Sequence, residues 1–417
     1  MTKPGVAYPK VREPQRAQAS FHFEVTEDLL PKEHPARLLW DVLGQFDLGP
    51  FLARTRSAEG VAGRSVLSPR MKLTLWLYGI SDGVGSAREI AERTTTELAY
   101  RWIVGDLSIG HHALSEFRAA HEAAFDALFT EVVSQLLHRG LIDLAVLAQD
   151  GTRTRAAASA PSFRSWGSLL ECRAQAALHL KAVLAQADDP ELSKAQKARR
   201  VTAALDFQRR VEEAIAACKS QREEHPASVA RGSTTDGDAR VMKMADGGFR
   251  PAYNVQYGVV GDRMGGPRTI VSVRVTTVGS DYGSLLPMVA QVEQRTGALP
   301  GSVLADSGHA QHADLEALMA CGVRPIVSVP TPRKGATAGA KVNRSAPIEA
   351  WRASMKDDAS KELARMRGSL SEFANARQKS PQGVRQVLVR GATKVLNVMV
   401  LGALSANLLQ HAASLLS

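Results

Sequence analysis

The chain has 417 residues, of which 44% are apolar and 23% charged, so it is long enough for two or three domains and too apolar to be disordered throughout. Lys and Arg outnumber Asp and Glu by 52 to 42, and the net charge of +10 favours a polyanionic partner, most often nucleic acid. The three cysteines, Cys172, Cys218 and Cys321, are far apart and odd in number. They exclude a disulfide framework and a cysteine-based zinc site, and they suit a reducing cytoplasm.

Two segments bear on targeting and on membranes. Residues 1–20 are polar and proline-rich, which predicts a flexible arm and not a signal peptide. Residues 395–417 contain no Asp, Glu, Lys or Arg and are long enough to span a bilayer. Polar residues interrupt that segment, namely Asn397, Ser405, Asn407, Gln410 and His411. We therefore expect a buried C-terminal helix over 391–417, packed on the preceding domain, and no membrane partner.

The first third of the chain predicts only helices. Ser68-Pro69 is typical of a helix start, and Ser86 stands three residues before Glu89, as in a capping box. A long helix is expected over 113–138, and the short helices within 86–105 are compatible with a helix-turn-helix-like pair. No strand-like run precedes residue 140.

After residue 140 the pattern changes to alternating strands and helices. A charged, alanine-rich segment from Trp166 to Glu224 predicts two antiparallel helices with a turn at Asp189-Pro190. The expected strands are 141–149, 252–260, 269–278, 302–305 and 323–329, and the expected helices are 282–296, 311–320, 350–379 and 391–415. A hairpin followed by alternating helices and strands gives an α/β fold with a mixed sheet and flanking helices.

The positive charge is concentrated near the C-terminus. Residues 331–395 contain fourteen Lys and Arg against five Asp and Glu, a net charge of +9 in 65 residues. The segment is either a solvated basic face or a groove for a phosphate backbone, where neutralised phosphates release counterions.

Two aspartates follow short apolar strands. Asp150 directly follows the run LIDLAVLAQ (141–149), and Asp306 directly follows SVLA (302–305). Sites in α/β sheets are commonly built at such strand ends. Taken singly, either aspartate could serve as a turn or cap residue.

A third acid lies on the basic C-terminal helix. Glu372 has Arg365 and Lys379 seven residues before and after it, so all three lie near one helix face. By itself Glu372 could equally be a salt-bridged surface residue. Together with Asp150 and Asp306, it could hold two Mg²⁺ ions, with Mn²⁺ expected to substitute. Two such metals can activate an attacking oxygen and stabilise a leaving one in a phosphodiester.

Several segments in order resemble a known family. They are HHALSEFR (111–118), LAQDGTRTRAAAS (147–159), FRPAYNVQ (249–256), VLADSGHAQHADLEAL (303–318) and RGSLSEFANARQK (367–379), with LVRGATKVLN and NLL behind them. They resemble bacterial insertion-sequence transposases of the DDE, RNase H-like class that carry an InsH-like helical N-terminal domain. The resemblance covers about residues 20 to 410.

The resemblance implies a domain organisation. A helical DNA-binding domain is expected over 21–140, and an RNase H-like catalytic domain over 141–390 with a helical insertion at about 160–225. The implied activity is recognition of terminal inverted repeats, cleavage that frees a 3′-hydroxyl, and attack of that hydroxyl on target DNA. Double-stranded DNA is the implied partner. Joining two ends implies a homodimer or higher oligomer in the active complex, in a bacterial cytoplasm, associated with the nucleoid.

The resemblance also implies site residues. The family's two metal-binding aspartates correspond to Asp150 and Asp306, and its glutamate to Glu372. Its lysine, seven residues after that glutamate, corresponds to Lys379. Arg365 stands where the family has a tyrosine. The family's arginine falls on Gly368, so Arg367 is expected to substitute for it; Arg377 is a further DNA contact on this helix.

Other residues receive simpler interpretations. His309 and His312 are expected to be surface or cap residues, and Asp281 is expected to cap the helix over 282–296. Asp236 and Asp238 suit a turn. No GxxxxGK[ST] loop is present in the sequence, so no nucleotide cofactor is expected.

Three functions remain open at this point. The leading hypothesis is a DNA transposase. The alternatives are a catalytically silent transposase remnant that binds DNA ends as a repressor, and a nuclease of the same fold.

Overall fold

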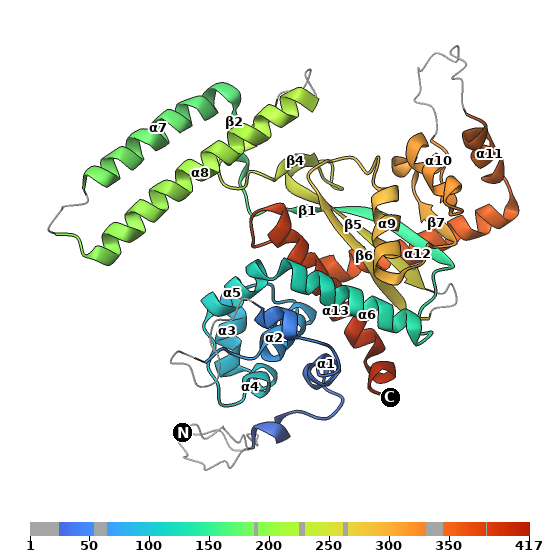
Figure 1. Cartoon of the computed structure of the whole chain (residues 1–417), viewed down its shortest axis with the longest axis horizontal. Helices are drawn as coiled ribbons and strands as arrows, with labels where there is room; N and C mark the ends of the chain where they lie inside the picture. The colour runs from blue at the N-terminus through green and yellow to red at the C-terminus, as the bar shows by residue number, and fades with distance from the viewer. Residues whose placement is uncertain are drawn as a thin grey trace, which may run out of the picture.

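The computed structural model describes residues 25–53, 65–186, 191–224, 230–261, 266–330, 345–380 and 382–417. These residues form a helical N-terminal domain, a mixed sheet with flanking helices, and a pair of long helices that projects from the sheet (Figure 1). The predicted α/β class and the helical N-terminal region are confirmed. The arm expected over 1–20, the turn at Asp189-Pro190 and most of the loop 331–348 lie outside the described residues.

The N-terminal domain is built from short helices around an apolar core. They are the 3₁₀ turns Thr26–Leu29 and Gly49–Leu52 and the helices α1 (Pro35–Leu43), α2 (Pro69–Ser81), α3 (Ala87–Thr96), α4 (Leu98–Val104), α5 (His111–Ala120) and α6 (Glu122–His138). The predicted caps are present, because Ser68 and Ser86 accept the N–H groups of Met71 and Glu89, each at 3.4 Å. The α3–α4 pair matches the short helices expected within 86–105.

One long helix was expected over 113–138, and this is wrong. His121 separates α5 from α6 with φ −117° and ψ 39°, outside helical geometry. Its ring packs against Phe51 and Phe117, with centroids 5.7 and 4.8 Å away. The bend therefore coincides with an aromatic cluster that a periodicity argument does not contain.

The sheet is mixed. Its strands are β1 (Val146–Arg155), β4 (Arg240–Lys243), β5 (Phe249–Gly261), β6 (Arg268–Thr276), β7 (Ser302–Ala305) and β8 (Arg324–Val327). The order is β4–β5–β1–β7–β8, with β6 also paired to β5. β5 is antiparallel to β1, β4 and β6, whereas β1, β7 and β8 are parallel. The predicted hairpin is β5–β6, and β7 has the predicted bounds.

The first strand lies further along the chain than expected. It was predicted over 141–149, but β1 begins at Val146 and continues to Arg155. The cause is pairing with β5, which runs from Leu147 opposite Val260 to Arg155 opposite Ala252. Asp150 is therefore inside β1 and not at its end.

Helices cover both faces of the sheet. They are α9 (Leu285–Thr296), α10 (His312–Ala320), α11 (Ala346–Ser354) and α12 (Asp358–Lys379), with the 3₁₀ turn Ser307–His309 after β7. On one face Leu370 of α12 packs in a buried cluster with Ala148, Leu304 and Ile326. The single helix expected over 350–379 is in fact α11 and α12, which are separated by residues 355–357.

The insertion between β1 and β4 is helical, as predicted. It contains a 3₁₀ turn (Ala160–Ser162), α7 (Trp166–Ala185) and α8 (Lys194–Glu224), and the short strands β2 (Phe163–Ser165) and β3 (Arg231–Ser233) pair at its base. Its own small core lies near that base and contains Leu169, Val211, Ala214, Ile215, Cys218 and Ala230. In Figure 1 the two helices extend away from the sheet.

The last helix, α13 (Ala392–Leu416), contacts β6 as well as α1, α2 and α6. Among the described residues it is the one helix long and apolar enough to cross a membrane, but most of it is buried. Its polar side chains bond inside the protein: Asn397 to Arg118, Ser405 to Leu77, and Asn407 to Ile270. The helix is thus a core element shared by the N-terminal domain and the sheet.

The start of α13 is tied to the loop before β4. Asp236 Oδ1 accepts the N–H of Gly391 at 3.1 Å, and Asp238 Oδ2 accepts the N–H of Ala392 at 2.9 Å. Both acids were expected to serve only their own turn. They satisfy N–H groups at a helix N-terminus, where negative charge is also favoured by the helix dipole.

We predict that Leu404→Ala lowers the free energy of unfolding by about 2–5 kcal/mol, because Leu404 is fully buried in the shared core. Both domains should lose stability together, in one thermal transition followed by circular dichroism. The control is Leu416→Ala at the partly exposed end of the same helix, which should cost much less. Two separate transitions, with only one of them shifted, would contradict the shared core.

Candidate active site

Asp150 and Asp306 lie on neighbouring parallel strands. The pairing of β1 with β7 ends with Ala148 opposite Leu304, and each aspartate follows two residues later. Neighbouring strands are about 4.8 Å apart, so this register places the acids close together. Burial raises the pKa of Asp150, and the negative charge of Asp306 adds to this shift. The sequence-based expectation of a paired acidic site therefore has a geometric basis in the sheet.

Asp150 faces α12 from inside β1. Its Oδ1 accepts the N–H of Gly151 at 2.9 Å, and its Oδ2 accepts Nδ2 of Asn375 at 3.0 Å. Burial raises the pKa of Asp150 above its ordinary value, and the Gly151 hydrogen bond and the charge of Arg367 partly oppose this. Burial therefore disfavours the ionised form of Asp150, and a nearby cation would favour it.

The pKa of Asp306 is displaced in the opposite direction to that of Asp150. Its Oδ1 accepts the N–H of Gly308 at 2.9 Å and contacts Nδ1 of His309 at 2.8 Å. The hydrogen bond from His309 lowers the pKa of Asp306, although burial acts in the other direction. The two acids thus have pKa values displaced in opposite directions, an arrangement often found at functional sites.

His309 is not a surface or cap residue, as had been expected. Its side chain is fully buried, and its Nε2 lies 3.3 Å from Oε1 of Gln256 on β5. His312, at the start of α10, is exposed. The HxxH spacing therefore separates a buried residue from an exposed one.

Asp281 does not cap α9, which begins four residues later at Leu285. Its Oδ1 accepts Nε2 of Gln256 at 2.6 Å and Nδ2 of Asn254 at 2.8 Å. Its Oδ2 pairs with Arg153 at 3.1 Å. Asp281 is therefore part of a buried polar network behind the acid pair.

Gly151 leaves room for this network. A Cβ at this position would lie 2.3 Å from Nε2 of Gln256 and 2.4 Å from Oδ1 of Asp281. Such distances are far below contact distance, and both atoms are held by the hydrogen bonds just described. The glycine after Asp150 is thus required by the close approach of two side chains.

The predicted residues of α12 have different surroundings. Glu372 is exposed, whereas Arg367 is partly buried and its charge lowers the pKa of both Asp150 and Asp306. Lys379 is partly buried; burial lowers its pKa, and the charge of Asp150 opposes that shift. Arg367 and Lys379 therefore act on the acid pair.

The other two predicted DNA contacts lie elsewhere. Arg365 pairs with Glu362 at 2.7 Å, and its side chain is 73% exposed. Arg377 stacks over the ring of Phe373, 5.5 Å from its centroid. Neither has a recorded interaction with Asp150 or Asp306. An exposed ion pair such as that of Arg365 contributes little to stability and leaves the cation accessible.

Three carboxylates do not meet at this site in the described conformation. Among the described residues, no three His, Cys, Asp or Glu side chains are grouped so that they could hold a metal ion. Unpartnered buried oxygens are nevertheless present near Asp150: Oγ1 of Thr152, two residues along β1, and Oδ1 of Asn375. Oxygen atoms are the ligands that Mg²⁺ prefers, directly or through water. The oxygens near Asp150 are therefore of the type that a hard cation takes as ligands.

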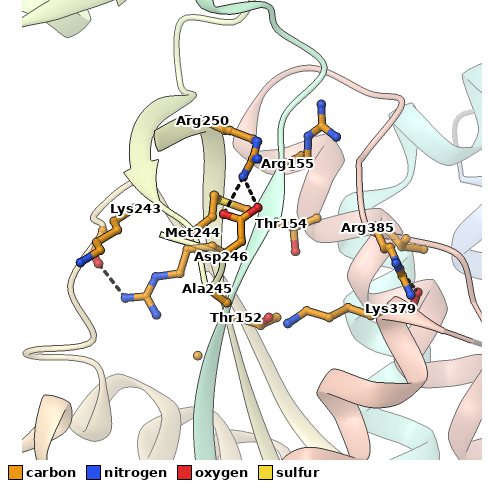
Figure 2. Close-up of a pocket in the computed structure, with 14 residues that line it drawn as sticks. Thr152, Thr154, Arg155, Lys243, Met244, Ala245, Asp246, Arg250, Lys379 and Arg385 are labelled. Atoms are coloured by element: carbon orange, nitrogen blue, oxygen red, sulfur yellow. Dashed lines mark hydrogen bonds and ion pairs between the residues drawn. The ribbon is translucent and has the colours of Figure 1, made fainter. Parts of the chain in front are cut away.

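A basic cavity of about 800 Å³ opens beside Gly151 (Figure 2). Its cationic lining residues come from β1, β4, β5, α12 and the segment after α12: Arg153, Arg155, Lys243, Arg250, Lys379 and Arg385. One acid, Asp246, also lines it and pairs with Arg250 at 2.7 Å. Figure 2 shows Lys379 reaching from α12 toward Thr152. The cavity suits a polyanion that passes close to Asp150.

The exposed face of α3 has a different charge. Glu89, Glu92 and Glu97 line a shallow hollow there together with Arg88 and Arg93. Arg93 is paired with Glu89, Glu97 and Asp82. The hollow therefore carries three glutamates against two arginines, and one of those arginines, Arg93, is paired with acids.

Part of the chain matches a known protein family. Residues 24–120 match a family described as a transposase domain (DUF772). No curated protein and no solved structure matches the chain. The match supports a transposase role, and more generally a DNA-processing enzyme. It ends before β1, so it bears on the helical N-terminal domain and not on the acid pair.

Sequence reasoning did not find several residues of this site. Asn375 and Gln256 were inside segments that carried the resemblance, but neither had been given a role. The basic residues of β1 and β4 were outside the charged C-terminal segment. Strand pairing and the packing of α12 on the sheet bring these residues together, so no local pattern could have identified them.

We predict opposite effects of neutralising the two aspartates on stability in metal-free buffer with EDTA. Asp150→Asn should raise the melting temperature at pH 7, because ionising a group with a raised pKa costs stability. This gain should shrink as the pH falls through the raised pKa of folded Asp150, and it should be gone below the ordinary value of 3.8, where the residue is protonated in both states.

Asp306→Asn should lower the melting temperature at pH 7. Its carboxylate has a lowered pKa, so its ionised form adds stability above pH 3.8 that is lost as the pH falls through the lowered pKa. Thermal melts of both variants across pH 3–8 test the pair. A shift of the same sign at pH 7 would contradict the assigned environments.

Proposed function

We propose that the chain is a DNA transposase of the DDE, RNase H-like type, which cleaves DNA and transfers strands at one metal-dependent site. The observation that carries this proposal is the pairing of Asp150 and Asp306 on adjacent parallel strands, next to a basic cavity. Acids alone suit many metal sites. Acids beside a cavity lined by six cations suit a site whose substrate is a polyanion.

Two further observations support the proposal. The mixed sheet with flanking helices and a helical insertion is the architecture that the RNase H-like resemblance implies. The match of residues 24–120 to a transposase domain supports the transposase role independently of the sheet.

In this proposal Asp150 and Asp306 hold two Mg²⁺ ions, for which Mn²⁺ substitutes. When bound, the ions activate the attacking oxygen and stabilise the leaving oxygen of a phosphodiester. Asn375 keeps one oxygen of Asp150 oriented through its hydrogen bond. Glu372 is three residues before Asn375 on α12, so a shift of the helix or a rotation of the side chain brings it toward Asp150 as a third ligand.

The proposed reaction has two steps. Water attacks the phosphorus at the transposon end, and the bond to the 3′-oxygen breaks, which leaves a 3′-hydroxyl and a 5′-phosphate. That hydroxyl then attacks a target phosphodiester, and the displaced 3′-oxygen of the target takes up a proton. Lys379 and Arg367 compensate the phosphate charge that accumulates beside the acids.

The remaining proposals concern partners. Double-stranded DNA is the proposed ligand of the basic cavity. Bringing two DNA ends together requires a homodimer or higher oligomer in the active complex. No nucleotide cofactor or membrane partner is proposed, and the protein would act on DNA in the bacterial cytoplasm.

We predict that Asp150→Ala and Asp306→Ala abolish Mg²⁺-dependent cleavage of a duplex carrying the element's ends, while end binding remains largely intact. The reason is that both residues hold metal and do not contact bases. The control is Asp246→Ala, which removes an acid from the same cavity but not from the acid pair. Cleavage at the wild-type rate by either variant would remove that aspartate from the site. Wild-type protein that binds ends but never cleaves would instead favour the silent end-binding protein.

We predict that Lys379→Ala weakens end binding and flattens its dependence on salt by about one unit of log–log slope, through the loss of one phosphate contact. The fold should survive, because a partly exposed lysine adds little stability. Lys361→Ala is the matched control on the same helix, since Lys361 is exposed and paired with Asp358 at 2.8 Å. Equal slopes for wild type and Lys379→Ala across a salt series would remove Lys379 from the DNA interface.

A further inference from the structure

Only one of the two carboxylate oxygens of Asp306 is hydrogen-bonded by the described residues. Both of its recorded hydrogen bonds, from Gly308 N–H and His309 Nδ1, go to Oδ1. No described residue bonds to Oδ2. One oxygen is therefore fixed by the protein, and the other remains available to a ligand.

The imidazole ring of His309, which contacts Oδ1 of Asp306, is fixed by its own surroundings. His309 is fully buried, and its second nitrogen faces Oε1 of Gln256 at 3.3 Å. Both ring nitrogens thus face acceptor oxygens. This arrangement fixes the plane of the ring as well as the direction of its Nδ1 toward Asp306.

The orientation of Gln256 is set by a third carboxylate. Its Nε2 donates to Oδ1 of Asp281 at 2.6 Å, so its Oε1 must point the other way, toward His309. Gln149 supports that orientation by donating its Nε2 to the same Oε1 at 3.2 Å. A continuous chain of polar contacts therefore runs from Asp281 through Gln256 and His309 to Asp306.

We propose that His309 is a positioning residue, which Gln256 and Asp281 hold in place and which presents the free oxygen of Asp306 to a divalent cation. The inference rests on the proposed metal-dependent function and deepens it. Groups that orient a metal ligand from behind often change metal affinity by about 10–100-fold when they are removed. His309 has this relation to Asp306, although it need not touch the metal or the DNA.

The competing interpretation is that His309 only fills the core between β5 and the turn after β7. The two interpretations differ in metal affinity. A filling role is met by any apolar side chain of similar size, whereas a positioning role needs an N–H directed at Asp306. Leucine meets the first requirement alone, and asparagine keeps an N–H donor close to the position of Nδ1.

The experiment is a Mn²⁺ titration of the purified full-length chain without DNA, in which free Mn²⁺ is measured by electron paramagnetic resonance. We expect His309→Leu to bind Mn²⁺ about 10–100-fold more weakly than wild type. His309→Asn should recover most of that loss. His312→Leu is the matched control, because His312 is exposed three residues later, and it should bind as wild type does.

A second readout uses DNA. The Mg²⁺ concentration for half-maximal cleavage should rise in His309→Leu, while end binding in EDTA stays unchanged. If His309→Leu does not fold, Gln256→Leu tests the same set of contacts, because it removes the partner of His309 Nε2. This variant should also weaken Mn²⁺ binding.

The outcomes separate the two proposals. Wild-type protein that binds Mn²⁺, together with a folded His309→Leu that binds it equally well, would overturn the role of His309 and leave the metal centre standing. A wild type that binds no Mn²⁺ would overturn the metal centre, and this inference with it. Weak binding by both His309→Leu and His309→Asn would also overturn the inference, because the donor would then not matter.

Discussion

The pairing of β1 on both of its edges is the constraint on which the site depends. β5 pairs with one edge along almost the whole strand, and β7 pairs with the other edge only as far as Ala148. The strand therefore continues beyond its parallel neighbour. Asp150 lies in this overhanging part, next to the turn that carries Asp306. Asn375 of α12 reaches Asp150 from the face of the sheet that α12 covers.

The same strand separates two chemical environments. Asp150 points to the α12 side, where its partner is Asn375 and positive charge is close by. The next residue, Gly151, lies against Gln256 and Asp281 on the other side. Because side chains alternate along a strand, a step of one residue separates the surface that carries Asp150 from a buried polar support. A shift of β1 by one residue would exchange the two and destroy both.

Much of the fold could be predicted from local patterns. The β5–β6 hairpin and β7 were recognised because apolar runs between glycines or acids are strong local signals. The bounds of β1 were missed, because residues 150–155 are polar and become a strand only through pairing with β5, about a hundred residues later. The break at His121 coincides with a tertiary aromatic cluster, which periodicity does not contain.

The site could be predicted only in outline. Its aspartates were identified from strand ends and from a resemblance, whereas Asn375, Gln256 and the buried state of His309 were not. These depend on which side chain faces which across the sheet: Gln256 meets His309 across 53 positions of sequence, and Asn375 meets Asp150 across 225. A spacing such as HxxH cannot distinguish a buried ring from an exposed one.

The position of α13 in the chain has a consequence for how the protein is made. Its Ser405 bonds to Leu77, 328 residues earlier, so the N-terminal helices obtain their main packing partner only after the whole sheet has been synthesised. Contacts this distant in sequence slow folding, and until they form the apolar faces of the early helices stay open to other chains. A ribosome that stalls before residue 392 thus releases a chain with two unfinished domains, and its early helices become targets for chaperones and proteases.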